Sequence, residues 1–247
     1  MKDHLNSFKR PVALVTGGSS FLGRSISLKF AQKGFDLALH YQSSKVETAR
    51  LANELEGLGA RILMVRADLR KAGQAGVAVQ KAVKTFKRLD LLINNASLFY
   101  PTPLSDHRIA PWLDLFNVNL FSPYVLSQSA YPWLAKTRGS IVNLTDIYGE
   151  HPVLRDYAGY CASKSALMTM TRFCAKEMGP SVRVNAVSPG AIFIPKNYSR
   201  KKRTELLNRS ALKRQGKAED IAEAVYFLAT QPFITGQILK VDGGRFI

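Results

Sequence analysis

The sequence predicts an α/β fold in which helices cover both faces of a doubly wound parallel sheet. Short apolar runs alternate with amphipathic stretches of helical length along the whole chain, which is the pattern of repeated βαβ units. A glycine-rich turn directly follows the first apolar run. The chain has 247 residues without an internal repeat, linker or break in composition. We therefore expect one domain over residues 1–247.

The expected elements follow each other in strict alternation. Residues 11–16 form an apolar run that predicts the first strand, and helical apolar spacing begins at Leu22. A long segment containing prolines precedes the last helix. Further strands are expected at 36–41, 61–66, 89–93, 140–144, 182–186 and 238–241. Further helices are expected at 45–58, 71–88, around 109–135, at 157–178 and at 218–229.

The composition is that of an ordinary globular protein, with 46% hydrophobic and 21% charged residues. No apolar run approaches the roughly 20 residues that span a bilayer, and the start MKDHLNSFKRP lacks the apolar centre of a signal peptide. We therefore expect a cytoplasmic protein with no membrane partner. Cys161 and Cys174 form no CxxC motif and have no clustered histidines, so we expect reduced thiols and no metal site.

The chain is strongly basic, with 35 Lys and Arg against 18 Asp and Glu and a formal charge of +17. Such a field attracts anions of every kind, both nucleic acids and phosphorylated small molecules. The densest basic run is 200–203, which Arg209, Lys213, Arg214 and Lys217 follow. No aromatic residues alternate with these cations, so a solvated face is favoured over a nucleic-acid site. A nucleic-acid-binding or nucleotide-sensing protein remains the rival from another class.

The glycine-rich turn Thr16–Gly23 joins the first strand to the first helix. In that place glycines allow backbone N–H groups to approach a pyrophosphate, and the start of the helix favours its negative charge. The turn predicts a Rossmann-type dinucleotide site, although an ordinary strand-to-helix loop can carry the same glycines. The cofactor contacts expected here come from Gly17, Ser19, Phe21, Leu22 and Gly23.

The end of the second strand favours NADPH over NADH. An acidic residue there would bind the ribose 2′-hydroxyl of NADH, whereas a 2′-phosphate needs hydroxyl donors or positive charge. No carboxylate occurs in 40–45, and Asp36 lies at the opposite end of the strand. We expect the 2′-phosphate to meet His40, Tyr41, Ser43 and Ser44, with Arg24 or Lys45 as added cations. The alternative is that these are surface turn residues.

Two further segments follow strands at the same edge of the predicted sheet. Asp68, with Leu69, comes after the third strand and is expected either to receive the adenine amino group or to cap a helix. Asn95, Ala96 and Ser97 come after the fourth strand. Open α/β sheets bind ligands at this edge, so we expect these residues in the cofactor site.

Tyr160 and Lys164 are four residues apart in a predicted helix and therefore lie on one helix face. A nearby ammonium favours the phenolate and lowers the pKa of the tyrosine, which predicts a proton-transfer group. A solvated pair is the alternative for this motif taken alone. Asp146 follows the strand 140–144 and is expected in the same crevice, while Asn119 is a candidate to hold a water for proton transfer.

Five motifs occur in one order: the glycine turn, Asn94-Asn95-Ala96, Tyr-x-x-x-Lys at 160–164, Ser188-Pro189-Gly190 and Val241-Asp-Gly-Gly244. In this the chain resembles the short-chain dehydrogenase/reductase family along nearly its whole length. The resemblance implies that Tyr160 is the general acid and base, that Lys164 lowers its pKa and binds the nicotinamide ribose, and that Asn119 supports a water chain. It also implies a homotetramer that packs through the helices around 109–135 and 157–178.

The same resemblance divides the expected site along the chain. It places cofactor binding mainly in 11–104 and the catalytic residues with the substrate loop in 140–200. It implies cofactor contacts from Pro189, Gly190 and Ile192 and a substrate contact from Phe193.

Within the family, the segments 40–44 and 95–104 and Asp146 resemble those of pteridine reductases. Most family members have Ser at the position of Asp146, and in pteridine reductases an Asp there acts with the Tyr to protonate the pterin. The resemblance implies that Phe99 stacks on the pterin and that Ser97 hydrogen-bonds pterin or cofactor; a packed loop is the alternative for Phe99. One departure is Phe21, where this subgroup usually has Arg.

Together these features predict an NADPH-dependent pteridine reductase of folate metabolism. It would transfer hydride to a pterin, a dihydropterin or dihydrofolate, with Asp146 and Tyr160 assisting protonation. The alternative is a short-chain carbonyl reductase acting on a 3-oxoacyl thioester or a sugar, an alternative that Phe21 favours and Asp146 disfavours.

Overall fold

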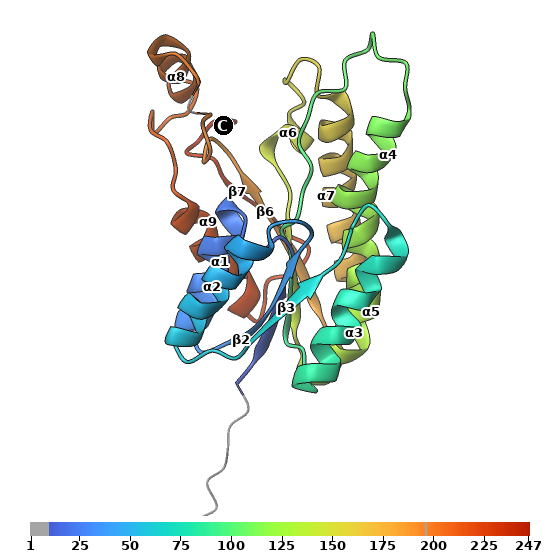
Figure 1. Cartoon of the computed structure of the whole chain (residues 1–247). Coiled ribbons are helices and arrows are strands. Elements are labelled where there is room, and N and C mark those ends of the chain that lie inside the picture. The colour runs from blue at the N-terminus through green and yellow to red at the C-terminus, as the bar shows by residue number, and fades with distance from the viewer. Residues whose placement is uncertain (1–9, 196) are drawn as a thin grey trace, which may run out of the picture.

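The computed structural model describes residues 10–195 and 197–247. Residues 1–9 and Lys196 lie outside the described residues. Residues 1–9 include most of the N-terminal segment from which a cytoplasmic location is predicted above. The strands form one parallel sheet of order β3-β2-β1-β4-β5-β6-β7 (Figure 1). They are β1 (Val12–Val15), β2 (Asp36–Tyr41), β3 (Ile62–Arg66), β4 (Leu91–Asn94), β5 (Ser140–Leu144), β6 (Arg183–Pro189) and β7 (Ile238–Val241).

Helices cover both faces of the sheet, as predicted (Figure 1). One face carries α1 (Phe21–Gln32), α2 (Lys45–Gly57) and α9 (Ala218–Thr230). The other carries α3 (Ala72–Phe86), α5 (Ser122–Thr137) and α7 (Ala158–Met178), with α4 (Ala110–Phe116) packed on α7. The predicted fold class, a Rossmann-type doubly wound sheet, is confirmed. Since the strand order reverses between β1 and β4, a ligand crevice is expected beyond the carboxyl ends of these strands.

The central strands are apolar on both faces because both faces are covered. Every residue of β1, β2, β4 and β5 is buried. Leu14 points to one core and Leu39 to the other, and both are fully inaccessible to solvent. Each such leucine stabilises the fold by about 1.5–3 kcal/mol, so the sheet is a rigid support for the loops at its edge.

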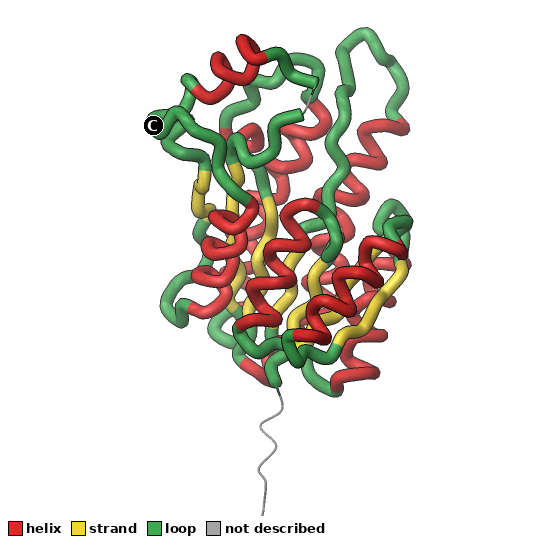
Figure 2. Tube along the Cα trace, turned by 60° about the vertical axis from the view of Figure 1, so that its left-hand side comes forward, coloured by secondary structure: helices red, strands yellow, loops and turns green. Residues whose placement is uncertain are grey.

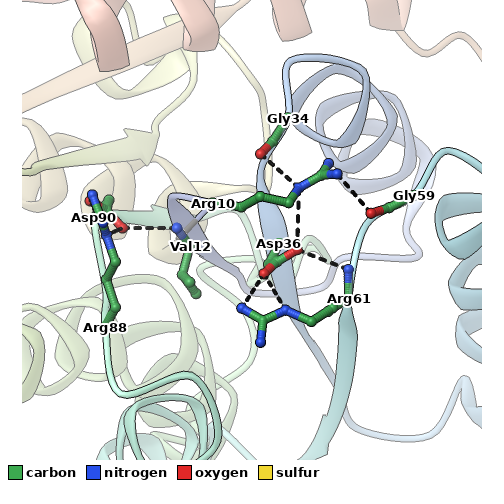
Figure 3. Close-up of polar contacts among 8 residues, drawn as sticks. All are labelled: Arg10, Val12, Gly34, Asp36, Gly59, Arg61, Arg88 and Asp90. Carbon is green, nitrogen blue, oxygen red and sulfur yellow. Dashed lines mark hydrogen bonds and ion pairs between the residues drawn. The ribbon is translucent and has the colours of Figure 1, made fainter. Parts of the chain in front are cut away.

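Charged residues hold the amino ends of the strands together, opposite the predicted site (Figure 3). Asp36, at the start of β2, is fully buried and forms ion pairs with Arg10 at 3.4 Å and Arg61 at 2.5 Å. Asp90 accepts the main-chain N–H of Val12 at 2.8 Å and so joins β1 to the segment before β4. Asp36 therefore belongs to the scaffold and is remote from the cofactor edge, as its place in the sequence indicates.

Three features differ from the elements predicted. The expected helix around 109–135 consists of α4, the π-helix η1 (Asn117–Phe121) and α5. A four-residue helix α6 (Ile147–Glu150) follows β5, and the basic run 200–203 forms the first half of α8 (Arg200–Leu207). No residue of α8 is buried, so its sequence has no apolar stripe to predict a helix.

Loops gather beyond the carboxyl end of the sheet, where α8 and the C-terminal segment lie next to each other (Figure 2). No helix in the described part of the chain is long and apolar enough to cross a membrane.

Candidate active site

One cleft of about 630 Å³ lies at the carboxyl ends of the central strands. It brings together twelve of the predicted residues, which come from distant parts of the chain. These are Phe21, Leu22, Asn95, Ser97, Phe99, Asp146, Tyr160, Lys164, Pro189, Gly190, Ile192 and Phe193. Ser19 lines a neighbouring hollow together with Phe21, and Asp68 lines another near the end of β3.

Two positions of the glycine turn, Gly17 and Gly23, do not accommodate a side chain without strain. Gly17 has a φ of +61°, which only glycine adopts freely. A Cβ at Gly23 would lie 2.1 Å from the carbonyl oxygen of Gly17. Ser20 caps α1 by accepting the N–H of Gly23 at 3.3 Å. The turn therefore holds the start of α1 close to the strand ends, in the geometry that suits a pyrophosphate.

Asn95 joins this turn to β4. Its Nδ2 donates to the carbonyl oxygens of Thr16 at 2.8 Å and Gly17 at 3.0 Å, and to the hydroxyl of Ser20 at 3.2 Å. The main-chain N–H of Ala96 donates to the hydroxyl of Thr16 at 3.0 Å. Asn95 therefore fixes the shape of the turn from the neighbouring strand.

Hydroxyl groups meet beside the turn where a 2′-phosphate is expected. The Ser19 hydroxyl lies 3.1 Å from that of Ser44 and 2.8 Å from that of Thr48. Thr48 was missed in the sequence, although it stands four residues after Ser44 and so on the same face of α2. Ser43 is exposed beside this group. The cluster offers hydroxyl donors without a competing carboxylate.

The expected contact of His40 with the 2′-phosphate is wrong. His40 is buried, its Nδ1 accepts the N–H of Gly17 at 3.2 Å, and its Nε2 donates to the carbonyl oxygen of Ala67 at 3.2 Å. Burial lowers the pKa of the imidazole, which is therefore neutral and fully occupied. The physical role of His40 is to support the glycine turn. Arg24 is also engaged, since it forms an ion pair with Glu54 at 2.7 Å.

The remaining residues expected at the 2′-phosphate and at the adenine divide into core and surface. Tyr41 and Leu69 are buried, so their side chains pack inside and only their main chain can face a cofactor. Asp68 accepts two hydrogen bonds from the guanidinium of Arg70, at 3.0 and 2.9 Å, and this lowers the pKa of the carboxyl. The cap position of α3 belongs to Lys71, so Asp68 does not cap that helix.

Asp146 and Tyr160 form a hydrogen-bonded pair in the cleft. The Tyr160 hydroxyl donates to Oδ2 of Asp146 at 2.8 Å. Asp146 follows β5 and caps α6, where Oδ1 accepts the N–H of Tyr148 at 2.9 Å. Burial raises the pKa of Asp146 above its usual value, against the effect of these hydrogen bonds and of Lys164. The pKa values of both groups therefore lie above their ordinary values.

The pKa of Tyr160 is raised in this structure, whereas a lowered pKa was expected from Lys164. Burial is the largest effect, and with the charge of Asp146 it raises the pKa of Tyr160 well above 10. Lys164 is buried, its Nζ donates to the carbonyl oxygen of Leu144 at 2.8 Å, and it lies 5.8 Å from the centre of the Tyr160 ring. Burial lowers the pKa of Lys164 to about 8, so its charge is itself partly lost.

Asn119 lies in the π-helix η1 and supports the loop after β4. Its Oδ1 accepts the N–H of Leu98 at 2.8 Å and the hydroxyl of Ser97 at 3.1 Å, and its Nδ2 donates to the hydroxyl of Ser163 at 3.0 Å. π-helical turns occur frequently at functional positions. The described contacts of this side chain are with the loop and with α7, and the proposed water chain stays a prediction.

Aromatic side chains form the walls of the cleft. Phe99 is 56% exposed, stacks on Tyr157 at 4.6 Å between ring centres and meets Tyr160 edge-on at 4.7 Å. Phe21 and Phe193 also line the cleft and make an edge contact at 5.7 Å between ring centres. An exposed flat ring beside the reacting pair can stack on a flat substrate. Tyr148, Arg209 and Arg245 also line the cleft and were missed, because no local motif marks them.

The described residues contain no group of three or more His, Cys, Asp or Glu able to hold a metal ion.

Comparisons with known proteins identify the family. A family model described as Enoyl-(Acyl carrier protein) reductase matches residues 18–245. The chain belongs to the short-chain dehydrogenase/reductase family. The 3-oxoacyl-(acyl-carrier-protein) reductase FabG of Thermotoga maritima is 35% identical over 244 residues, 96% of this chain and 98% of that protein. The granaticin polyketide synthase putative ketoacyl reductase 2 of Streptomyces violaceoruber is 34% identical over 245 residues, 96% of each.

A solved structure extends the likeness to three dimensions. It is the blue fluorescent protein from a metagenomic library in complex with NADPH, with a TM-score of 0.90 and 34% identity over 96% of this chain and 98% of that one. NADPH is also the cofactor that the sequence predicts here. This short-chain dehydrogenase/reductase is thus an NAD(P)-dependent oxidoreductase. The curated relatives named above are ketoacyl reductases, so they favour the acyl thioester alternative over the pteridine reductase subgroup.

Proposed function

We propose that this short-chain reductase uses NADPH to reduce a C=N bond in a pterin, a dihydropterin or dihydrofolate. The observation that carries the proposal is the partly buried carboxyl of Asp146 in hydrogen-bond contact with Tyr160. A carboxyl group can accept hydrogen bonds from the N–H and amino groups of such a ring and can pass a proton to a ring nitrogen. The open ring face of Phe99 supports a flat substrate.

The cleft residues have separate roles in this reaction. The glycine turn and the three clustered hydroxyl groups of Ser19, Ser44 and Thr48 fit the phosphates of NADPH. When bound, the nicotinamide supplies the hydride that adds to the carbon of the C=N bond. Asp146 and Tyr160 provide the proton that the nitrogen takes up, which completes a CH–NH unit. Lys164 stabilises negative charge on the pair once that proton has left.

The remaining assignments follow the family resemblance. Pro189, Gly190 and Ile192 contact the cofactor, and Phe193 contacts the substrate. Residues 11–104 mainly bind the cofactor, and 140–200 carry the catalytic residues and the substrate loop. Asn119 supports a water chain that returns a proton to the pair. The protein acts as a cytoplasmic homotetramer.

Reduction of a 3-oxoacyl thioester is the second candidate. The named relatives favour it, and the apolar part of the cleft lined by Phe21 and Phe193 suits an acyl chain. The carboxyl of Asp146 has no role of its own in that reaction, because Tyr160 alone can protonate the oxyanion that develops at a reduced carbonyl.

The test follows NADPH consumption with dihydrobiopterin, dihydrofolate and an acetoacetyl thioester offered in parallel. We expect turnover of the pterins and a loss of about 100-fold to 10,000-fold in Tyr160→Phe, with NADPH affinity largely retained. Asp146→Ser should lower pterin reduction selectively. Turnover confined to the thioester would establish the second candidate instead.

A further inference from the structure

The end of the cleft remote from the cofactor turn is lined by cationic side chains. Lys202 lies on α8, Arg209 follows that helix, and Arg245 lies near the end of the chain. All three line the cleft that contains Asp146 and Tyr160. The fold produces this convergence, and the roles given above to the cleft residues do not include these three side chains, although the charge of Arg245 acts against the raised pKa of Asp146.

Arg245 is held in a fixed position. Its two terminal nitrogens donate to the hydroxyl of Tyr148 at 3.1 Å and to the carbonyl oxygen of Leu206 at 3.3 Å. Its guanidinium carbon lies 5.6 Å from the centre of the Tyr148 ring and 5.7 Å from that of Phe246. Its Nε is buried and has no hydrogen-bond partner among the described residues. An oriented guanidinium with unused donor capacity is suited to an anion.

These cations also lack acidic partners. Within 10–195 and 197–247, no ion pair involves Lys202, Arg209 or Arg245, whereas several other arginines pair with carboxylates. One acid, Glu205, lines the same part of the cleft. Three cations against one acid leave the far end of the cleft positive, in a chain whose total charge is +17.

Tyr148 connects this end of the cleft to the reacting pair. Its main-chain N–H binds Asp146, and its hydroxyl binds Arg245. Burial raises the pKa of Tyr148, while the charges of Arg245 and Arg209 act in the opposite direction, so both guanidinium groups lie near this phenol. One residue therefore spans the distance between the proton-transfer group and the cations.

We propose that Arg209 and Arg245 bind an anionic group at the end of the substrate remote from the reacting atoms, so that the enzyme prefers anionic to neutral substrates. The ring assigned to this substrate rests on the proposed function. The shared chemistry is a carboxylate or phosphate: dihydrofolate carries carboxylates on its glutamyl tail, and a coenzyme A thioester carries phosphates. Arginine forks bind both groups through paired N–H donors.

The experiment compares kcat/KM for dihydrofolate and for the neutral dihydrobiopterin in four proteins. These are the unmodified enzyme, Arg209→Gln, Arg245→Gln and the control Lys201→Gln, which removes the same charge from an exposed position of α8 outside the cleft lining. We expect each arginine variant to lower the ratio of kcat/KM for the anionic substrate to kcat/KM for the neutral one by about tenfold. This factor corresponds to the free energy of one charged hydrogen bond. The control should keep the ratio of the unmodified enzyme.

A parallel pair of acyl substrates separates this proposal from the proposed function. Acetoacetyl coenzyme A is anionic, and the N-acetylcysteamine thioester of the same acyl group is neutral. If only thioesters turn over, the pterin assignment fails, and the ratio for this pair still tests the cations. Equal ratios in the unmodified enzyme and both arginine variants would overturn the proposal.

Two further measurements test the proposal if a variant fails to fold or if no turnover is detected. Arg245 contacts several groups of the scaffold, so thermal unfolding of Arg245→Gln checks its fold, and the exposed Arg209 provides an independent variant. Calorimetric titration of the NADP-loaded protein with folate and with biopterin needs no turnover. Folate should bind more tightly, and equal affinities would contradict the proposal.

Discussion

The hydroxyl of Tyr160 donates to one carboxylate oxygen of Asp146 at 2.8 Å, while the main-chain N–H of Tyr148 occupies the other at 2.9 Å. Tyr160 is buried and Asp146 is partly buried, and both have raised pKa values: burial is the largest cause for each, and the nearby carboxyl adds to it for Tyr160. Because the two groups are hydrogen-bonded, we expect them to titrate as a pair. Such a pair retains a transferable proton at a higher pH than an exposed carboxyl does.

The pH dependence of catalysis should depend on Asp146. Since its pKa is raised, the protonated form is present at low pH, and kcat/KM for dihydrobiopterin should fall as pH rises through that pKa. Asp146→Asn should lose this limb and about 100-fold or more of the activity. The measurement is the pH profile of both proteins. A limb that persists in the variant would assign the titration to another group, such as Lys164.

Lys164 should make stability depend on pH. Its pKa in the folded protein is about 8 against an ordinary 10.5, so the unfolded chain binds more protons between these values and the free energy of unfolding rises with pH there. Relative to Lys164→Met, the unmodified protein should gain about 1 to 2 kcal/mol between about pH 8 and pH 9.5. Urea unfolding at both pH values measures this. A constant difference would mean that Lys164 titrates outside this range.

The turn that fits the pyrophosphate should not tolerate a side chain at Gly23. Alanine there would place Cβ 2.1 Å from the carbonyl oxygen of Gly17. We expect Gly23→Ala to lose about 1 to 3 kcal/mol of stability and to weaken NADPH binding by about tenfold or more. The control is Gly73→Ala in α3, where a Cβ meets nothing within 4 Å, and which should stabilise the helix by up to about 1 kcal/mol. Equal behaviour of the two variants would remove the special role of Gly23.

The contact of Phe21 with Phe193 should affect substrate binding. The ring centres lie 5.7 Å apart, and the two residues remain 53% and 66% exposed. The free energy of their contact is therefore at the low end of the range for an aromatic pair. Each alanine variant should raise the substrate KM by about threefold, and the double variant should raise it by less than the product of both. Phe233→Ala, at a fully exposed ring, is the control. Strictly multiplicative effects would show that the two rings act independently.

Elements with a strong local signal could be predicted to the residue. β2 and β5 were predicted with the bounds that the structure has, because both are uninterrupted buried runs between turns. The π-helix η1 was not predictable, since its apolar spacing differs little from that of the α-helices on either side. α8 was missed because its residues are exposed and its sequence is therefore free of any apolar period.

The candidate site was predictable only where a motif marks it. The glycine turn, Asn95, Asp146, Tyr160 and Lys164 all meet at one edge of the sheet, because each follows a strand or faces one. Arg245 and Arg209 belong to no local pattern, and only the return of the chain over the sheet places them in the cleft. His40 shows the opposite failure: its position at a strand end was correct, but its ring turns inward to Gly17.

Asp146 is also the residue that begins α6 by accepting the N–H of Tyr148. Serine is as good a helix cap as aspartate, and serine is the residue that the family resemblance gives for most members at this position. Exchange between the two residues therefore preserves the local backbone while it replaces a proton-donating acid with a neutral hydroxyl. A change of the acid-base group at this position is therefore compatible with an unchanged start of α6.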